Sequence, residues 1–185
     1  MEHVLVFASI VIGVAVTEIL TSLHRLLRHR ALVRWDWLPL AVALLVLLTL
    51  VQTWWSIAQP SQEATTIGQF VPILVELIML FLLAAACLPD LVDESGLDLT
   101  DYYKANHSYI WTLYALNLGW ALATGAAQAS NSFAGFVSAL ADRSADFVFV
   151  GVMASLALTE RRWWHIAALA LLSVGPILWM SRSLS

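Results

Sequence analysis

Six apolar stretches, each long enough to cross a membrane as a helix, constrain this 185-residue chain more than any other feature. A spanning helix needs about 20 mostly apolar residues, at about 1.5 Å of rise per residue. The predicted spans cover residues 4–23, 38–58, 69–88, 108–128, 144–158 and 164–180. They leave no room for a separate soluble domain. We therefore predict an all-α, polytopic transmembrane helix bundle, with residues 1–185 forming one domain.

The composition supports this class and excludes others. Hydrophobic residues make up 61% of the chain and charged residues 12%, whereas soluble domains carry about 25% charged residues. The net charge is −4 and the nine lysines and arginines form no long basic run, so a nucleic-acid partner is not expected. The only cysteine, Cys87, cannot form an internal disulfide. The expected partner is the lipid bilayer.

The fifth span is interrupted near its start by Asp142, Arg143 and Asp146. A short span could begin near Ser144, which would leave residues 130–141 as an interfacial or re-entrant piece. Alternatively, a long helix begins near Ser132 and its charges lie inside the bundle. The sequence leaves both alternatives open.

The distribution of basic residues predicts the orientation. Cytoplasmic connections are enriched in lysine and arginine, and tryptophan favours both membrane boundaries. All tryptophans except Trp120 fall near a predicted boundary. Most of the basic residues follow the first, third and fifth spans: Arg25, Arg28, Arg30, Arg34, Lys104, Arg161 and Arg162. We therefore expect both termini outside and three cytoplasmic connections.

Four short motifs carry a resemblance to a known group of proteins. They are Gly13-x-Ala15-x-Thr17-Glu18-Ile19-Leu20, Gln52-x-Trp54-Trp55, Leu88-Pro89-Asp90 with Asp98-Leu99-x-x-Tyr102-Tyr103, and Arg161-Arg162-x-x-His165. Together they resemble a family of small bacterial six-span membrane proteins that has no assigned activity. The resemblance implies a bacterial cytoplasmic (inner) membrane and carries no chemistry.

Two carboxyl groups fall inside predicted spans. An ionisable group at the bilayer centre costs roughly 2.5–3.5 kcal/mol on insertion scales, and Glu76 lies in the apolar run 71–79. Apolar surroundings favour its uncharged form, which could relay a proton, or donate a hydrogen bond to another helix. Glu18, in the first span, is either a second station on a path or a snorkelling partner of Arg25.

A polar stripe follows the fourth span. Its members recur at helical spacing and so share one face; they are His107, Tyr114, Asn117, Thr124 and Gln128. Gln52 on the second span could join them. Such a stripe must face the bundle interior, a cavity or another subunit. It indicates either hydrogen bonds between helices or a water-lined path.

Small residues recur every fourth position on the first span, at Ser9, Gly13, Thr17 and Thr21. This pattern lets helices approach closely and predicts helix packing or a homo-oligomer. Gly151 and Ser155 on the fifth span are interpreted in the same way.

Histidines raise the hypothesis of a metal or haem site. His24, His107 and His165 all fall near the predicted inner boundary, and helical bundles collect ligands from facing helices. No pair of ligands has metal-site spacing on one helix, so no cofactor is expected. No phosphate loop, zinc-protease motif or serine-nucleophile motif occurs, and the sequence does not favour an enzyme.

The connection at residues 90–104 is acidic. It is interpreted as solvated, with docking onto the basic first connection as the alternative, and Asp98 or Thr100 is expected to cap the following helix.

The leading functional hypothesis is passage of a proton, small ion or small solute along a polar path inside the membrane. Glu76 would be the central titrating group. The predicted path is lined by Glu76, Asn117, Gln52, Glu18, Tyr114 and Thr124. The alternatives are a structural or partner-binding membrane protein without transport, and a metal- or haem-binding membrane protein.

Overall fold

A computed structural model describes residues 2–59, 67–93, 96–130 and 132–180, and these residues are almost entirely helical. The elements in chain order are α1 (Glu2–Arg28), η1 (Arg30–Leu32), β1 (Val33–Arg34), α2 (Trp37–Ala58), α3 (Ile67–Cys87), β2 (Leu97–Asp98), α4 (Leu99–Gln128), α5 (Phe133–Asp142), α6 (Ser144–Leu158) and α7 (Arg162–Met180). The predicted all-α class is confirmed.

Three helices in the described part are long and apolar enough to cross a membrane. They are Val4–Arg28, Trp37–Ala58 and Phe70–Cys87. The other three predicted spans coincide with α4, α6 and α7, so the helices fall where the hydropathy pattern places them.

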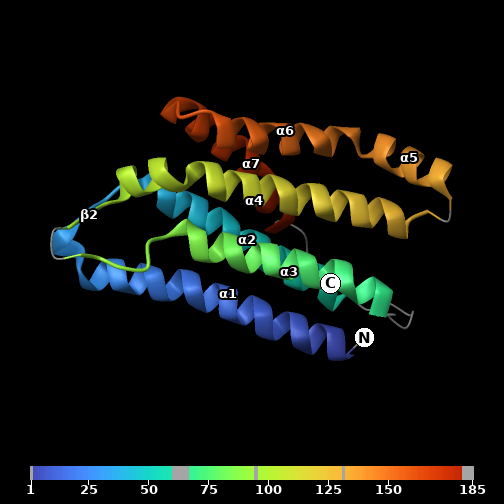
Figure 1. Cartoon of the computed structure of the whole chain (residues 1–185), viewed down its shortest axis with the longest axis horizontal. Helices are drawn as coiled ribbons and strands as arrows, with labels where there is room; N and C mark the ends of the chain where they lie inside the picture. Colours follow the sequence, from blue (N-terminus) through green and yellow to red (C-terminus); the bar gives the residue numbers. More distant parts are fainter. Residues whose placement is uncertain (1, 60–66, 94–95, 131, 181–185) are drawn as a thin grey trace.

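The long helices form two layers (Figure 1). In the front layer α1, α3, α4 and the pair α5–α6 lie side by side, while α2 and α7 lie behind them. The third helix packs against α1, α2 and α4, and α7 packs against α2 and α6. Thus α3 is an interior helix with neighbours on three sides.

The first helix buries a different face from the one that its small residues suggest. Its buried positions include Ala8, Ile12, Ala15 and Ile19, which follow helical periodicity. A Cβ atom added at Gly13 would meet no atom within 4 Å, and the same holds at Gly151. Close packing at these glycines is therefore absent from the described part of the chain, and their role in an oligomer stays a prediction.

The remaining members of the two small-residue sets make hydrogen bonds. Ser9 Oγ accepts from Trp54 Nε1 at 3.0 Å, and Thr17 Oγ1 donates to the carbonyl of Gly13. Ser155 Oγ accepts from Trp164 Nε1 at 2.9 Å. Thr21 is half-buried.

Residues 133–158 form two consecutive helices that are interrupted at Arg143. Ser132 caps α5, because its Oγ accepts from the Gly135 amide at 3.1 Å. Both α5 and α6 lie along α4. Asp142 and Arg143 are exposed, so these charges do not lie inside the bundle, and that part of the long-helix alternative is wrong.

The two connections at one end of the bundle are joined, and we call this end the ribbon end. Strands β1 and β2 pair in parallel, with Val33 opposite Leu97 and Arg34 opposite Asp98. The Arg34 guanidinium lies 3.0 Å from the Asp98 carboxylate. Docking of the acidic connection onto the basic one, the alternative to a solvated loop, is therefore confirmed.

Two further contacts fasten this end. Arg25 Nη1 donates to the Asp90 carbonyl at 2.9 Å, and Ser22 Oγ donates to the Asp90 carboxylate at 3.1 Å. Asp98 caps α4 by accepting from the Thr100 amide at 2.8 Å, as expected. That backbone hydrogen bond, together with the nearby Arg34, holds the pKa of Asp98 below its ordinary value.

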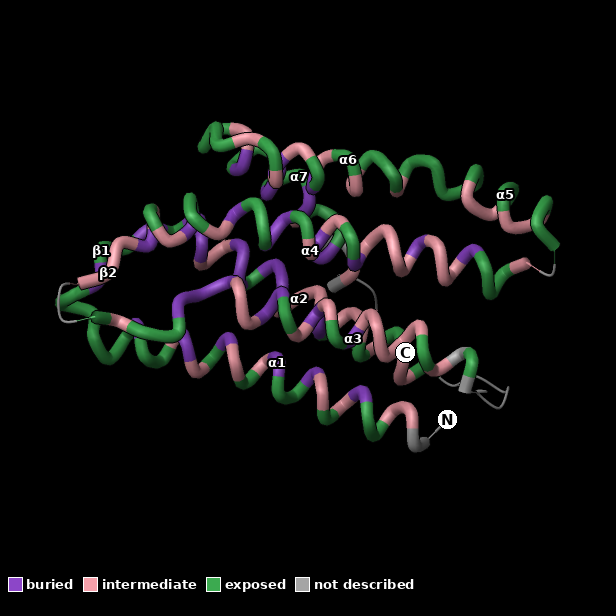
Figure 2. Tube along the Cα trace, viewed as in Figure 1, coloured by how far each residue is buried: buried purple, intermediate pink, exposed green. Residues whose placement is uncertain are grey.

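Burial is unevenly distributed along the bundle (Figure 2). Three helices, α2, α3 and α6, bury residues only in the half nearer the ribbon end, and α5 buries none, whereas α1 and α4 also bury Ala8, Leu122 and Ala126 toward the far end. No described residue is buried in α2 beyond Leu50, in α3 before Leu77, anywhere in α5, or in α6 before Met153. The bundle thus has a tightly packed ribbon half and a loosely packed far half.

Candidate functional site

A cluster of polar groups, most of them buried, lies where α2, α4 and α7 begin; we call it the junction cluster. Its members are Asp36, Thr100, Tyr103, His107, Trp111, Arg162 and His165. Asp36 precedes α2 and caps it, since its carboxylate accepts from the Leu38 amide at 3.1 Å. Asp36 is only 6% exposed. A buried carboxylate needs a cation and hydrogen-bond donors around it.

Arg162 and Thr100 supply these partners. Arg162 Nη1 and Nη2 donate to the two Asp36 oxygens at 2.6 and 2.8 Å, and Thr100 Oγ1 donates at 3.1 Å. Burial raises the pKa of Asp36, but the hydrogen bonds from Arg162, the Leu38 amide and Thr100 outweigh burial and lower it overall. The same pairing raises the pKa of Arg162. Asp36 is therefore ionised near neutral pH and ties three helix starts together.

A hydrogen-bonded chain of aromatic side chains adjoins this ion pair. His165 Nε2 lies 2.6 Å from the Thr159 carbonyl, which can only accept, so Nε2 carries the proton. His165 Nδ1 then accepts from the Tyr103 hydroxyl at 2.7 Å, and that hydroxyl accepts from Trp111 Nε1 at 2.8 Å. Every polar atom of this chain is used, which fixes His165 as a neutral ring.

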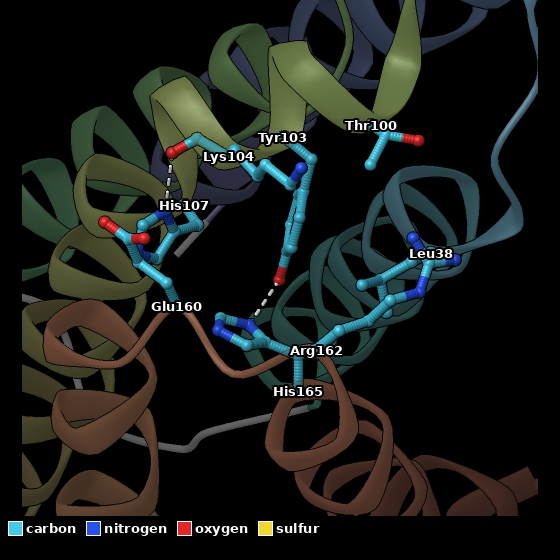
Figure 3. Close-up of a pocket in the computed structure, with 8 residues that line it drawn as sticks. All are labelled: Leu38, Thr100, Tyr103, Lys104, His107, Glu160, Arg162 and His165. Atoms are coloured by element: carbon cyan, nitrogen blue, oxygen red, sulfur yellow. Dashed lines mark hydrogen bonds between the residues drawn. The ribbon is translucent and has the colours of Figure 1, made fainter.

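His107 differs from His165 because only its Nδ1 makes a hydrogen bond to another described residue. Its Nδ1 donates to the Lys104 carbonyl at 2.8 Å, which leaves Nε2 as an acceptor. The His107 and His165 rings meet edge to face, with their centroids 5.5 Å apart. Figure 3 shows Tyr103 and His165 pointing toward one another, with His107 and Glu160 drawn among the residues that line the same pocket.

These side chains line a small pocket together with Leu38, Lys104 and Arg162. The cavity volume is about 30 Å³. On the same measure, one water molecule needs about 10–15 Å³. The pocket is thus large enough for one or two waters, or for a group of similar size.

The predicted metal ligands are only partly brought together. His107 and His165 are neighbours, but His24 is an exposed residue of α1. The described part of the chain contains no group of three His, Cys, Asp or Glu side chains that could hold a metal ion. The metal or haem hypothesis stays a prediction.

Two members of the polar stripe of α4, Tyr114 and Asn117, face neighbouring helices. The Tyr114 hydroxyl is hydrogen-bonded to Thr49 Oγ1 of α2. Asn117 Nδ2 donates to the Glu76 carbonyl at 3.4 Å. Tyr114 and Asn117 are buried, whereas Gln128 at the end of the helix is exposed.

Other predicted path residues lie farther from this contact network. Thr124 Oγ1 donates to carbonyls of its own helix. Gln52 is half-buried one turn beyond Thr49, in the part of α2 where burial ends. Glu18 is half-buried on α1, and its suggested partner Arg25 donates to Asp90 instead.

Glu76 occupies a distinctive place on α3. It shares one helical face with Leu80, Leu83 and Cys87, which follow it by four, seven and eleven residues. These three are at most 1% exposed, whereas Glu76 is half-buried. The carboxyl group therefore lies on the inward face of α3, at the level where tight packing ends.

Sequence reasoning missed most of the junction cluster. Asp36, Thr100, Tyr103, Trp111 and Arg162 were not predicted as site residues. Asp36 directly precedes an apolar helix, where aspartate often caps the helix. Arg162 belongs to the motif Arg161-Arg162-x-x-His165. No spacing rule, however, links residues 36 and 162.

Comparison with protein-family models, curated proteins and solved structures gives no match to this chain.

Proposed function

We propose that this protein passes a proton, or a small ion or solute, along the polar interior of a six-span bundle. In this proposal α1, α2, α3, α4, α6 and α7 cross a bacterial inner membrane, and both termini lie outside. The ribbon end, with its arginines, then faces the cytoplasm. The protein would act as a homo-oligomer that associates through the small-residue face of α1.

The position of Glu76 carries the proposal. A carboxyl group on the inward face of an interior helix is expensive unless it meets protein partners or water. The backbone carbonyl of Glu76 accepts from the buried Asn117 amide, and Glu76 is half-buried at the level where the burial of α3 begins. A group in that setting can take up a proton or a cation from the far side.

The ribbon half supplies the barrier of the proposed path. Between Asn117 and the pocket at His107 lies a stacked pair, Trp111 and Tyr114, with ring centroids 5.8 Å apart and planes 11° apart. Trp111 is fully buried, and Leu50 and Leu80 are likewise inaccessible. Passage would therefore require this stack to move, which corresponds to a closed conformation.

The test is flux into proteoliposomes that contain the purified protein, with an internal pH dye and, separately, cation-sensitive dyes. Wild type should show flux that depends on external pH, and Glu76→Gln should abolish it. Asp146→Asn is the matched control, because Asp146 is a half-buried carboxyl on α6 that lies outside the path. Equal flux in wild type and Glu76→Gln would remove Glu76 from the proposal.

A structural role without transport is the second candidate, and one observation favours it. In the described part of the chain, no fully buried side-chain nitrogen or oxygen lacks a hydrogen-bond partner. Tyr114 and Asn117 of the polar stripe bond to neighbouring helices, and Thr124 bonds within α4, so these members need no water-lined path. Absence of any flux in wild type, with Glu76→Gln folded normally, would support this candidate.

A further inference from the structure

Residues 25–37, which we call the basic segment, form an exposed charged surface at the ribbon end. Within it only Leu26, Val33 and Asp36 are buried. Asp36 caps α2. All other residues up to Trp37 are exposed. The buried residues and the β1–β2 pairing fix the backbone, so its outward side chains form a preformed surface.

The cations of this surface are not all neutralised within the chain. Arg34 pairs with the Asp98 carboxylate, and Arg25 donates to the uncharged backbone carbonyl of Asp90. Arg28 and Arg30 form no ion pair in the described part of the chain. Two guanidinium groups two residues apart are therefore available to an external anion.

Large apolar side chains are interleaved with these cations. Leu27 is 54% exposed, Leu32 43%, Trp35 43% and Trp37 51%. Such a mixture of arginine with exposed leucine and tryptophan is typical of segments that lie in the headgroup layer. It distinguishes a membrane surface from a free anion, to which exposed leucine and tryptophan contribute nothing.

The level of the segment along the bundle agrees with this chemistry. It begins in the last turn of α1, and α1 has the length and apolarity of a membrane span over Val4–Arg28. Guanidinium groups form paired hydrogen bonds with phosphate oxygens. Clusters of basic residues beside a spanning helix attract anionic lipids.

From these observations we infer that the basic segment binds the phosphate headgroup of an anionic phospholipid, held by Arg28 and Arg30 with Leu27 and Trp35 inserted between lipids. This site is independent of the proposed transport path. It requires no particular orientation of the protein, since anionic phospholipid is needed only in the leaflet that the ribbon end meets.

The test is native mass spectrometry of the purified full-length chain titrated with phosphatidylglycerol or phosphatidylcholine. Wild type should bind phosphatidylglycerol more tightly than phosphatidylcholine. At about fivefold per arginine, Arg28→Gln with Arg30→Gln should weaken phosphatidylglycerol binding about 25-fold and leave phosphatidylcholine binding unchanged. Arg28→Lys with Arg30→Lys should retain most of the preference.

The matched control is Lys104→Gln with Arg161→Gln, which removes the same charge from two exposed residues outside the segment. This control should change phosphatidylglycerol binding by less than about threefold, as expected for charges farther from the headgroup. Equal losses in the two double variants would overturn the inference, because only net charge would then matter. Full displacement of the lipid by equimolar inorganic phosphate would also overturn it, by indicating a free-anion site. Circular dichroism of each variant verifies folding.

Discussion

The two halves of the bundle solve the problem of polar groups in different ways. In the ribbon half, polar side chains bond to one another across helices: Asp36 with Arg162, and Tyr103 with His165. In the far half, Asn117 and Trp120 donate to backbone carbonyls of α3, at Glu76 and Pro72, and one bond joins side chains of two helices, from Trp54 to Ser9. Side chains that bond only to one another leave unpaired groups behind when one is removed, whereas a helix carbonyl keeps its own helical bond.

This difference teaches where the fold is fixed and where it can change. A cluster whose members depend on one another holds helix starts in a single arrangement. The far half has little burial and weak helix-to-backbone contacts, and regions of that kind open most easily. The comparison predicts that mutations in the ribbon half cost more stability than mutations in the far half.

The largest loss of stability is expected from Asp36→Ala. It removes the cap of α2 and leaves Arg162 and the Thr100 hydroxyl without their acceptor, at a cost of about 2–3 kcal/mol. This lies below the 3–5 kcal/mol of a fully buried pair, because the Arg162 side chain is 48% exposed. The free energy of unfolding in mixed micelles measures the loss. Asp98→Ala is the control, since Asp98 also caps a helix and pairs with an arginine, but at the exposed surface; its loss should be smaller.

The Asp36 contribution should also depend on pH. The pKa of Asp36 is lowered in the folded protein, so its stabilisation is complete above the unfolded value near pH 4. It is lost as the pH falls through the lower folded value. The stability difference between wild type and Asp36→Ala should therefore shrink below about pH 4, and a difference that grows on acidification would contradict the assigned ion pair.

Tyr103→Phe should be the next most damaging change. It removes the hydroxyl that accepts from Trp111 and donates to His165, which leaves two buried groups unpaired at a cost of about 1–2 kcal/mol. Tyr109→Phe on the same helix is the control, because Tyr109 is 50% exposed. If the two variants unfold at the same denaturant concentration, the junction cluster does not hold the ribbon half together.

The sequence predicted the helices well because hydropathy and periodicity are local properties. It placed Asp98 as a cap and the Tyr114–Asn117 face toward other helices, since capping and helical spacing involve neighbouring residues. It did not predict the Asp36–Arg162 pair, whose members are 126 residues apart, or the Tyr103–His165 bond. Those contacts depend on which helix starts come together, which no single-helix pattern specifies. The same limit explains α1, where two helical faces carried small residues and only packing against α3 selected the Ala8–Ile12 face.

Asn117→Leu should have a small effect on stability. The hydrogen bond it removes is long, at 3.4 Å, and such bonds between membrane helices contribute about 0.6 kcal/mol on average. Trp120→Phe, which removes the 2.9 Å bond to the Pro72 carbonyl, provides the comparison at the next turn. Both should cost less than Tyr103→Phe in the same mixed-micelle measurement. A larger loss in Asn117→Leu than in Tyr103→Phe would show that the far half is not the weaker one.

Gly125→Ala should have the smallest effect and tests the looseness of the far half directly. A Cβ atom at Gly125 would lie 2.5 Å from Arg143 Nη1, which is the end of a flexible, exposed side chain. If the far half yields, the guanidinium moves aside, and the gain of alanine over glycine in a helix, about 0.5–1 kcal/mol, roughly offsets the displaced contact. Gly119→Ala on the same helix meets no atom within 4 Å and should show that gain in full. A loss above about 2 kcal/mol in Gly125→Ala, relieved by Arg143→Ala, would mean that Arg143 is held rigidly against α4. The far half would then be a second fixed region, and the proposed route from Glu76 to the aqueous phase would have to open elsewhere.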